Sequence, residues 1–180
     1  MRSLFYHETG ALSQSEIDDI RQAAKSLPSQ EGRIFSTDPD QQDMRHCIIK
    51  WVRDSFIQNQ LYEFVQKAND QCFGCDVINQ ADMQYVIYDG KTGGHYDWHH
   101  DVHFSSQDEL DRKLSVTVPL SDPADYEGGL FEFDEVSTNA DFRAAGSVLI
   151  FPSYLRHKVN RVTKGERHAL VAWFFGPRWR

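Results

Sequence analysis

The sequence predicts an α+β domain in which two helices support a β-sandwich of the jelly-roll type. Two amphipathic helical patterns occur in the first 75 residues, whereas the chain from Asp76 onward forms short β-like runs separated by turn residues. Helices followed by strands are typical of α+β proteins, and many short strands are typical of sandwiches and barrels. We expect a single domain, 1–180, with helical support over about 1–75 and a jelly-roll core over about 76–177.

The first helix is expected at residues 13–27. Ser13 followed by Glu16 resembles a capping box, apolar residues then recur at helical spacing, and Pro28 ends the pattern. A second helix is expected over about 54–70, where six apolar residues form one stripe. Both helices are therefore predicted to pack one face against the sheet.

One short strand is predicted between the two helices, and several more are predicted after them. The polar stretch from Glu31 to Met44 is expected to be a loop, and Ile48 is expected to lie in a short strand. The clearest strand patterns are at Met83–Tyr88, Leu114–Leu120, Gly129–Phe133, Ser147–Phe151 and Arg167–Phe174.

Composition limits the classes of partner. The formal net charge of -8 disfavours binding that depends on neutralising many phosphates, so nucleic acid is not the expected substrate. No run approaches the roughly 18 apolar residues that a membrane span needs. The first residues, MRSLFYHETG, do not resemble a secretory signal, which favours a cytoplasmic location.

The three cysteines, Cys47, Cys72 and Cys75, do not make a disulfide framework, because their number is odd. A reducing compartment fits this count. The spacing of Cys72 and Cys75 is that of half a zinc site or of a redox pair, but no second pair completes four thiolate ligands. Buried free cysteines without a functional role are the simpler interpretation.

A candidate metal site centres on the segment from Gly93 to Asp101. Residues two apart on an extended chain share a face, so His99 and Asp101 can point at one ion while His100 points away. A third ligand is expected from His157, which follows a buried-strand pattern and a Pro-Ser turn. Two imidazoles and one carboxylate on one side of an ion form the facial triad of non-haem Fe(II) oxygenases. Three coordination positions of the ion stay open, which is enough for a bidentate oxo acid and dioxygen.

A bidentate 2-oxoglutarate would need a cation for its distal carboxylate. Arg167 lies ten residues after His157, and a strand, a turn and a returning strand can bring its guanidinium beside the site. Arginine suits this task because its planar fork makes two parallel bonds to one carboxylate. Ser115 or Thr117, on the polar face of one predicted strand, could add a hydroxyl donor.

Taken together, these residues resemble the prolyl 4-hydroxylase-like branch of the 2-oxoglutarate/Fe(II) oxygenase superfamily. The resemblance runs from about Tyr85 to Pro177 and rests on Tyr88, Gly93–Asp101, Ser121–Pro123, Tyr126–Gly129, His157 and Arg167. It implies a double-stranded β-helix that holds Fe(II) through His99, Asp101 and His157. It also implies 2-oxoglutarate on Arg167 with help from Tyr88, dioxygen as oxidant, and ascorbate as a candidate reductant.

The chain departs from parts of this pattern. Prolyl 4-hydroxylases that act on collagen often use Lys for the distal carboxylate, where this chain has Arg167, and the following Ala169 removes the Arg-x-Ser pattern of other branches. Asp101 points to hydroxylation, because related halogenases replace that carboxylate with a small residue. Thr163 stands six positions after His157, where the nucleic-acid demethylase branch has Arg.

Substrate contacts are expected near the metal segment. Tyr96 and Trp98 are candidate aromatic contacts, with core packing as the alternative. His95 and His103 could line the substrate mouth, with a structural role as the alternative.

The implied reaction is hydroxylation of an unactivated C-H bond. A peptidyl prolyl residue is the first candidate substrate, and the same chemistry on a free amino acid or small metabolite is the alternative. Loops 89–94 and 105–112 are expected to recognise the substrate. Two rival hypotheses keep the same ligands: a non-catalytic jelly-roll module that binds 2-oxoglutarate or metal, and a zinc hydrolase in which the three ligands activate water.

Overall fold

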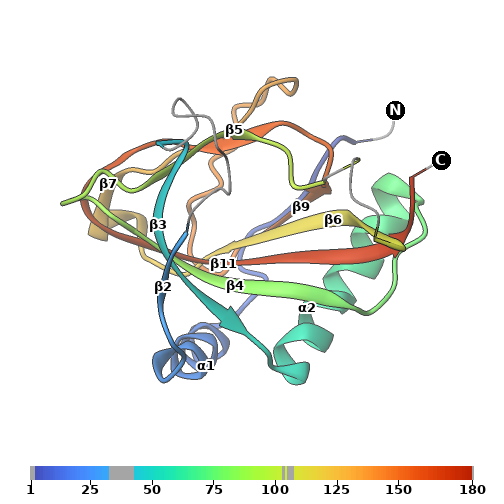
Figure 1. The fold of residues 1–180 in the computed structure, drawn as a ribbon, viewed down its shortest axis with the longest axis horizontal. Helices are drawn as coiled ribbons and strands as arrows, with labels where there is room; N and C mark the ends of the chain where they lie inside the picture. Colours follow the sequence, from blue (N-terminus) through green and yellow to red (C-terminus); the bar gives the residue numbers. More distant parts are fainter. Residues whose placement is uncertain (1–2, 33–42, 103, 105–107, 180) are drawn as a thin grey trace.

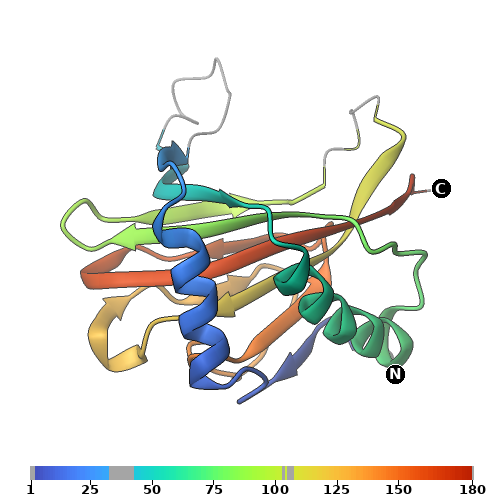
Figure 2. The same ribbon diagram turned by 90° about the horizontal axis from the view of Figure 1, so that it is seen from below.

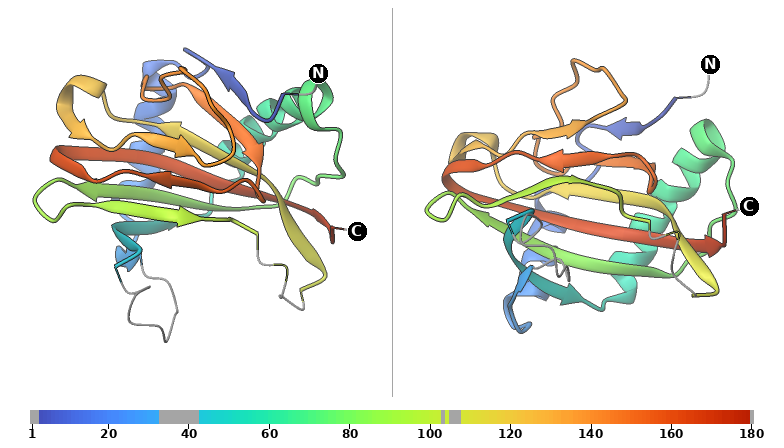
Figure 3. Two further views of the ribbon diagram at one scale, coloured as in Figure 1. Left: turned by 90° about the horizontal axis from the view of Figure 1, so that it is seen from above. Right: turned by 45° about the horizontal axis from the view of Figure 1, so that its top comes forward.

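A computed structural model describes residues 3–32, 43–102, 104 and 108–179, and it confirms the α+β prediction. The described residues form an 11-stranded, mostly antiparallel sheet that curls into a half-barrel, in which β3 curves between β5 and β4 (Figure 1). Both helices pack on one face of this sheet (Figure 2). The two ends of the described chain lie at the same end of the molecule (Figure 3).

The strands are β1 Tyr6–Glu8, β2 Gln30–Gly32, β3 Arg45–Val52, β4 Ala81–Asp89, β5 His95–His99, β6 Leu110–Pro119, β7 Tyr126–Gly128, β8 Phe131–Phe133, β9 Val148–Pro152, β10 His157–Val159 and β11 Val162–Pro177. Their order in the sheet is β1-β9-β6-β11-β4-β3-β5-β10-β8, with β2 paired to β3 and β7 paired to β11. Strands far apart in sequence, such as β5 and β10, are therefore neighbours.

Helix α1, Gln14–Lys25, begins at the predicted cap. The Ser13 hydroxyl accepts a hydrogen bond from the backbone N–H of Glu16, and the Glu16 carboxylate accepts one from the backbone N–H of Ser13 at 2.6 Å. This reciprocal pair satisfies two backbone donors that the first turn would leave unpaired. The prediction of a helix at 13–27 is thus confirmed to within two residues.

Helix α2, Ser55–Ala68, begins at Asp54, whose carboxylate accepts from the N–H groups of Phe56 and Ile57. Ile57, Leu61 and Val65 are buried in the core, and each contributes about 1.5–3 kcal/mol by leaving water. Phe56 was expected on the same stripe, but its side chain is 71% exposed, because it lies in the first turn on the outer side. A π-helical turn, Asn69–Phe73, extends this helix.

One face of the sheet packs against the helices, and the opposite face carries the candidate ligands among apolar side chains. On β6, Leu114, Val116 and Val118 pack in the same core cluster as the helices. Ser115 and Thr117 alternate with them and face the other side, where the candidate ligands lie. The alternation of one strand thus supplies both the core and the wall of the site.

Several boundaries differ from the predictions. The first 75 residues supply β1, β2 and β3 to the sheet as well as the helices, so the predicted division near residue 75 does not separate helices from strands. The predicted strand 129–133 is confined to β8, because Gly128, the last residue of β7, and Gly129 have φ of 80° and 62° and interrupt the extended chain. Residues 31–32 of the predicted loop belong to β2, and 33–42 lie outside the described residues.

Within the described ranges, no helix is both long enough and apolar enough to cross a bilayer.

Candidate metal centre

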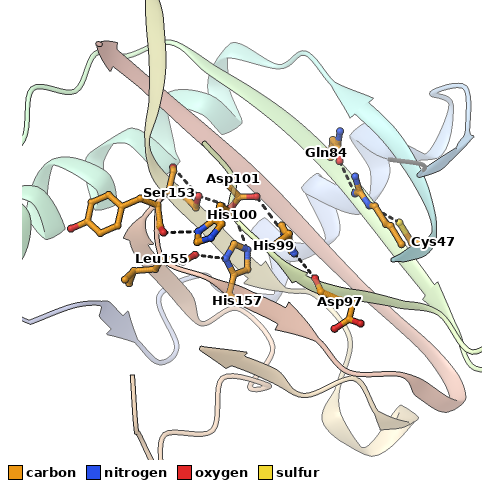
Figure 4. A network of polar contacts seen from close by, with 12 residues as sticks. Cys47, Gln84, Asp97, His99, His100, Asp101, Ser153, Leu155 and His157 are labelled. Carbon is orange, nitrogen blue, oxygen red and sulfur yellow. Dashed lines mark hydrogen bonds and ion pairs between the residues drawn. The ribbon is translucent and has the colours of Figure 1, made fainter. Parts of the chain in front are cut away.

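Three predicted ligands meet at the junction of β5 and β10. His99 ends β5, Asp101 follows it, and His157 opens β10 directly opposite His99. The Nε2 atom of His99 lies 3.5 Å from Oδ1 of Asp101, and Nε2 of His157 lies 3.4 Å from Oδ2 (Figure 4). One ligand atom from each residue falls within 4.8 Å of the others. The geometry suits a single ion bound by two imidazoles and one carboxylate.

Backbone carbonyl groups orient both imidazoles. Nδ1 of His99 lies 2.7 Å from the carbonyl oxygen of Asp97, and Nδ1 of His157 lies 2.9 Å from that of Leu155 (Figure 4). A neutral imidazole that donates from Nδ1 keeps its lone pair on Nε2. Both Nε2 lone pairs can therefore point at the same ion.

A buried pair of serines supports Asp101. The Ser115 hydroxyl donates to Oδ2 of Asp101 at 2.7 Å and lies 2.9 Å from the Ser153 hydroxyl. The backbone N–H of Asp101 also donates to the Ser153 carbonyl at 2.9 Å. Either Ser115 or Thr117 was expected to contact 2-oxoglutarate, and the Ser115 hydroxyl is directed at the metal ligand instead. Ser153 was not predicted, because only the pairing of β6 with β9 places it here.

The protonation states also suit a metal ligand set. Burial alone would raise the pKa of Asp101, but the two imidazoles and the Ser115 hydroxyl hold it well below its usual range. Burial lowers the pKa of His157 to about 4. At neutral pH the site therefore offers a carboxylate and a neutral imidazole, the forms that bind metals.

A β-bulge brings Tyr96 onto His99. His157 and Val159, two residues apart on β10, pair with His99 and Tyr96, which are three apart on β5. Simple alternation would place Tyr96 on the opposite face from His99. Instead the two rings stack, with centroids 3.4 Å apart and planes inclined by 6°.

Arg45 also packs on the Tyr96 ring, a contact that the sequence analysis did not predict. Its guanidinium carbon lies 4.6 Å from the Tyr96 ring centroid, and its Nη2 atom donates to Gln84 at 2.9 Å. Arg45 comes from β3, which pairs with β5 across a long sequence separation. An arginine at the start of a strand was the only local signal, and it is not a specific one.

Arg167 brings an unneutralised charge to the same pocket. It is 2% exposed, lies opposite Tyr88 across β11 and β4, and places its guanidinium carbon 5.4 Å from the Tyr88 ring centroid. Within the described residues, its Nε atom has no hydrogen-bond partner and no carboxylate forms an ion pair with it. A buried cation without a partner is unfavourable unless an anion binds beside it.

One pocket joins these groups. Its lining includes the three ligands, Arg45, Tyr88, Tyr96, Thr117, Phe131, Arg167 and Trp173. Trp173 adds a second buried donor, since its Nε1 atom also has no partner in the described part of the chain. The lining therefore offers ligands for a metal ion and, close to them, hydrogen-bond donors for an oxygen-rich anion, and Thr117 also lies on its wall.

Other predicted substrate residues lie elsewhere. Trp98 packs beneath Arg156 and Lys158, with cation-to-ring distances of 5.5 and 4.6 Å, and does not line the metal pocket. His95 is buried, and its ring nitrogens lie 2.8 and 2.7 Å from the carbonyl oxygens of Gly93 and Asp43, which is a structural role. His103 lies outside the described residues, as do positions 105–107 of one predicted recognition loop.

The outward residues of the metal segment have local partners. His100 points away from the ligands, as expected, and its Nδ1 atom lies 2.8 Å from the Tyr154 carbonyl oxygen. Loop 89–94 is a tight turn in which the Asp89 carbonyl accepts from the N–H groups of Thr92 and Gly94.

The cysteine pair shows no metal site. Cys72 and Cys75 are free thiols, and burial raises the pKa of both, which keeps them protonated. In the described part of the chain, only the His99, Asp101 and His157 group gathers enough ligands for an ion. The spacing of these two cysteines therefore carries no metal-binding argument.

Comparisons with known proteins agree with this geometry. The family described as the 2OG-Fe(II) oxygenase superfamily matches residues 83–175. A PKHD-type hydroxylase from Synechococcus sp. (strain CC9311) is 32% identical over 123 residues, which cover 67% of this chain and 55% of the relative. The chain spans 32% to 58% of the length of three such curated relatives.

Solved structures share the fold. The viral collagen prolyl hydroxylase of Paramecium Bursaria Chlorella virus-1 superposes with a TM-score of 0.71 at 18% identity and covers 97% of both chains. A prolyl hydroxylase in complex with a hypoxia inducible factor oxygen degradation domain peptide fragment, from Trichoplax adhaerens, gives a TM-score of 0.68 at 19% identity. The match covers 96% of this chain and 84% of that one.

Proposed function

Because the chain belongs to the 2OG-Fe(II) oxygenase superfamily, we propose that it is an Fe(II)- and 2-oxoglutarate-dependent dioxygenase. The proposed reaction is hydroxylation of an unactivated C-H bond, with a peptidyl prolyl residue as the first candidate substrate. The observation that carries the proposal is one pocket that contains both the three-ligand cluster and the unpaired Arg167.

The protein residues divide the work between binding and positioning. His99, Asp101 and His157 would hold the iron from one side and leave its other side open. Bound iron, together with 2-oxoglutarate and dioxygen, supplies the oxidising chemistry. Arg167 would bind the distal carboxylate of 2-oxoglutarate through two parallel hydrogen bonds, and the Thr117 hydroxyl would add a donor.

Aromatic and apolar side chains would keep this site dry. Tyr96 stacks on His99, and the His157 ring packs against Phe131 and Phe151 with centroids 5.3 and 4.7 Å away. Burial raises the pKa of Tyr96 to about 12, so its phenol stays protonated and can donate a hydrogen bond. Exclusion of water strengthens the interaction of Arg167 with a carboxylate and protects the reaction from side chemistry.

The substrate class rests on similarity. Relatives described as PKHD-type hydroxylases and a structural neighbour with a bound peptide support a peptidyl prolyl substrate. A free amino acid or a small metabolite is the alternative. A cytoplasmic location is also proposed, and it agrees with three free cysteines. The proposal further includes a single domain over 1–180 and ascorbate as the reductant.

The decisive experiment adds Fe(II) and then 2-oxoglutarate anaerobically to metal-free protein and records the visible absorption spectrum. We expect a weak metal-to-ligand charge-transfer band that requires both additions, is lost in His99→Ala and is weakened in Arg167→Ala. Lys164→Ala, at an exposed position, is the control and should keep the band. No band in folded, iron-loaded protein would exclude the assignment of 2-oxoglutarate.

Turnover is tested separately. Substrate-dependent formation of succinate from 2-oxoglutarate distinguishes an enzyme from a non-catalytic module that binds the same groups. Hydrolysis that depends on Zn(II) and not on 2-oxoglutarate would support the zinc hydrolase instead.

A further inference from the structure

A second cavity is lined by residues near both ends of the described chain, which lie at the same end of the molecule (Figure 3). Its volume is about 600 Å³, within the range of small-molecule pockets. The wall includes Cys75, Asp76, Lys113, Tyr154, Arg178 and Trp179. None of the three metal ligands lines it, so this Lys113 cavity is distinct from the metal pocket.

Lys113 places a buried ammonium group at this cavity. The residue is only 4% exposed, and its Nζ atom lies 3.8 Å from the ring centroid of Trp179. Among the described residues, Lys113 Nζ forms no hydrogen bond and no ion pair with a carboxylate. Burial lowers the pKa of Lys113, and the negative charges of Asp111 and Asp76 offset this effect only in part.

The nearby carboxylates do not form an ion pair with the Lys113 ammonium group. Oδ2 of Asp111 accepts a hydrogen bond from the backbone N–H of Trp179 at 2.7 Å, and the indole N–H of Trp179 donates to the Arg112 carbonyl at 3.4 Å. Asp76 also lines the cavity, but it does not come within ion-pair distance of Lys113. An ammonium group has three donors, and one ring face satisfies them only in part.

Aromatic groups form the adjoining wall. The rings of Tyr154 and Trp179 meet edge to face, with centroids 5.4 Å apart and planes inclined by 73°. Tyr154 is 40% exposed, so its ring is available to a ligand. The cavity therefore combines one buried positive charge with aromatic surface.

We propose that the Lys113 cavity is a second binding site, which takes a carboxylate carried on an apolar or aromatic body. The carboxylate would accept charge-assisted hydrogen bonds from Lys113, and the body would pack on Tyr154 and Trp179. The same chemistry is present in a free aromatic acid and in an acidic residue beside an aromatic one in a peptide.

The Lys113 cavity lies next to Ser153, which helps to position the metal ligand Asp101. The backbone N–H of Ser153 donates to the Lys113 carbonyl at 2.9 Å, and the Ser153 carbonyl accepts from Asp101 at 2.9 Å. A ligand in the cavity would thus lie next to the segment that positions Asp101. The binding proposal itself does not depend on the proposed reaction.

The test titrates two matched pairs of probes into isotope-labelled protein. Binding of each probe is monitored through the backbone amide chemical shifts of the protein. The first pair is 4-phenylbutyrate and 4-phenylbutyramide, and the second is acetyl-Phe-Glu-amide and acetyl-Phe-Gln-amide. We expect saturable shifts at Cys75, Tyr154 and Trp179, with the acid bound about tenfold more tightly than its amide in at least one pair. The pair with the larger preference identifies the free acid or the peptide as the source.

Variants separate charge from folding. Lys113→Gln should remove the preference for the acid, Lys113→Arg should keep it, and the exposed control Lys164→Gln should leave it unchanged. His99→Ala should also leave it unchanged, because the cavity does not use the iron site. Equal binding of acid and amide, shifts confined to the metal pocket, or no saturable shifts in folded wild-type protein would each overturn the proposal.

Discussion

The hydroxyl of Ser115 provides a quantitative test of how the fold prepares the metal site. Ser115 is fully buried and donates to Oδ2 of Asp101 at 2.7 Å. A hydrogen bond to a charged group contributes about 1.5–3 kcal/mol, and 1.4 kcal/mol corresponds to a factor of ten in affinity. Ser115→Ala should therefore weaken Fe(II) binding by about 10- to 100-fold, the range found when groups behind metal ligands are removed.

The Ser153 hydroxyl limits this effect, because it lies 2.9 Å from that of Ser115 and can rotate toward Asp101 in its absence. The double variant Ser115→Ala/Ser153→Ala should therefore reach the upper end of the range. Anaerobic calorimetry with Fe(II), or with Co(II) as a stable substitute, measures the affinity.

A matched control separates metal binding from stability. Ser147 is equally buried, and its hydroxyl donates to the Ala144 carbonyl at 2.7 Å, but it contacts no metal ligand. Ser147→Ala should lower the melting temperature and leave the metal affinity unchanged. Unchanged affinity in the folded double variant would refute the role assigned to the serine pair.

Three further predictions follow from the same structure. Arg167→Met should weaken 2-oxoglutarate binding at least 100-fold in a calorimetric titration while Fe(II) binding persists, because two charge-assisted bonds are lost; equal binding would contradict the assignment. In metal-free protein, the pKa of His157 falls from 6.5 to about 4 on folding. As the pH falls, His157 is therefore protonated in the unfolded chain before it is protonated in the folded protein. The free energy of unfolding should fall as the pH drops from about 6.5 toward 4, and His157→Gln should flatten this pH dependence in urea titrations. Ser13→Ala should cost about 1 kcal/mol of unfolding free energy by urea titration, without any change in metal affinity, because it removes only the cap of α1.

Local signals explain which parts of the fold could be predicted. The cap at Ser13 and the apolar spacing of both helices act within a few residues, so the two helices were found. Strands β1 and β2 have only three residues each and depend on pairing with β9 and β3. A three-residue segment carries no sequence pattern that indicates its pairing strand, so the sequence analysis missed β1 and β2.

The candidate site also contains residues with a local sequence signal and residues that only strand pairing places. His99 and Asp101 are close in sequence, and His157 and Arg167 stand at characteristic spacings after a buried strand, so the sequence predicts these four residues. Ser153, in contrast, reaches Asp101 only through strand pairing. The position of Tyr96 depends on a bulge, which shifts the alternation of β5 by one residue.

The charge balance of the metal pocket bears on the rival hypotheses. Asp101 is the only carboxylate that lines this pocket in the described part of the chain, whereas Arg45 and Arg167 both line it. Once Asp101 binds a divalent cation, the excess of positive charge grows, and it is relieved only by an anionic ligand. A zinc hydrolase acting on a neutral substrate would leave Arg167 unpaired, whereas a dicarboxylate that spans the ion and Arg167 neutralises both. The buried guanidinium therefore favours an anionic co-substrate, independently of any resemblance.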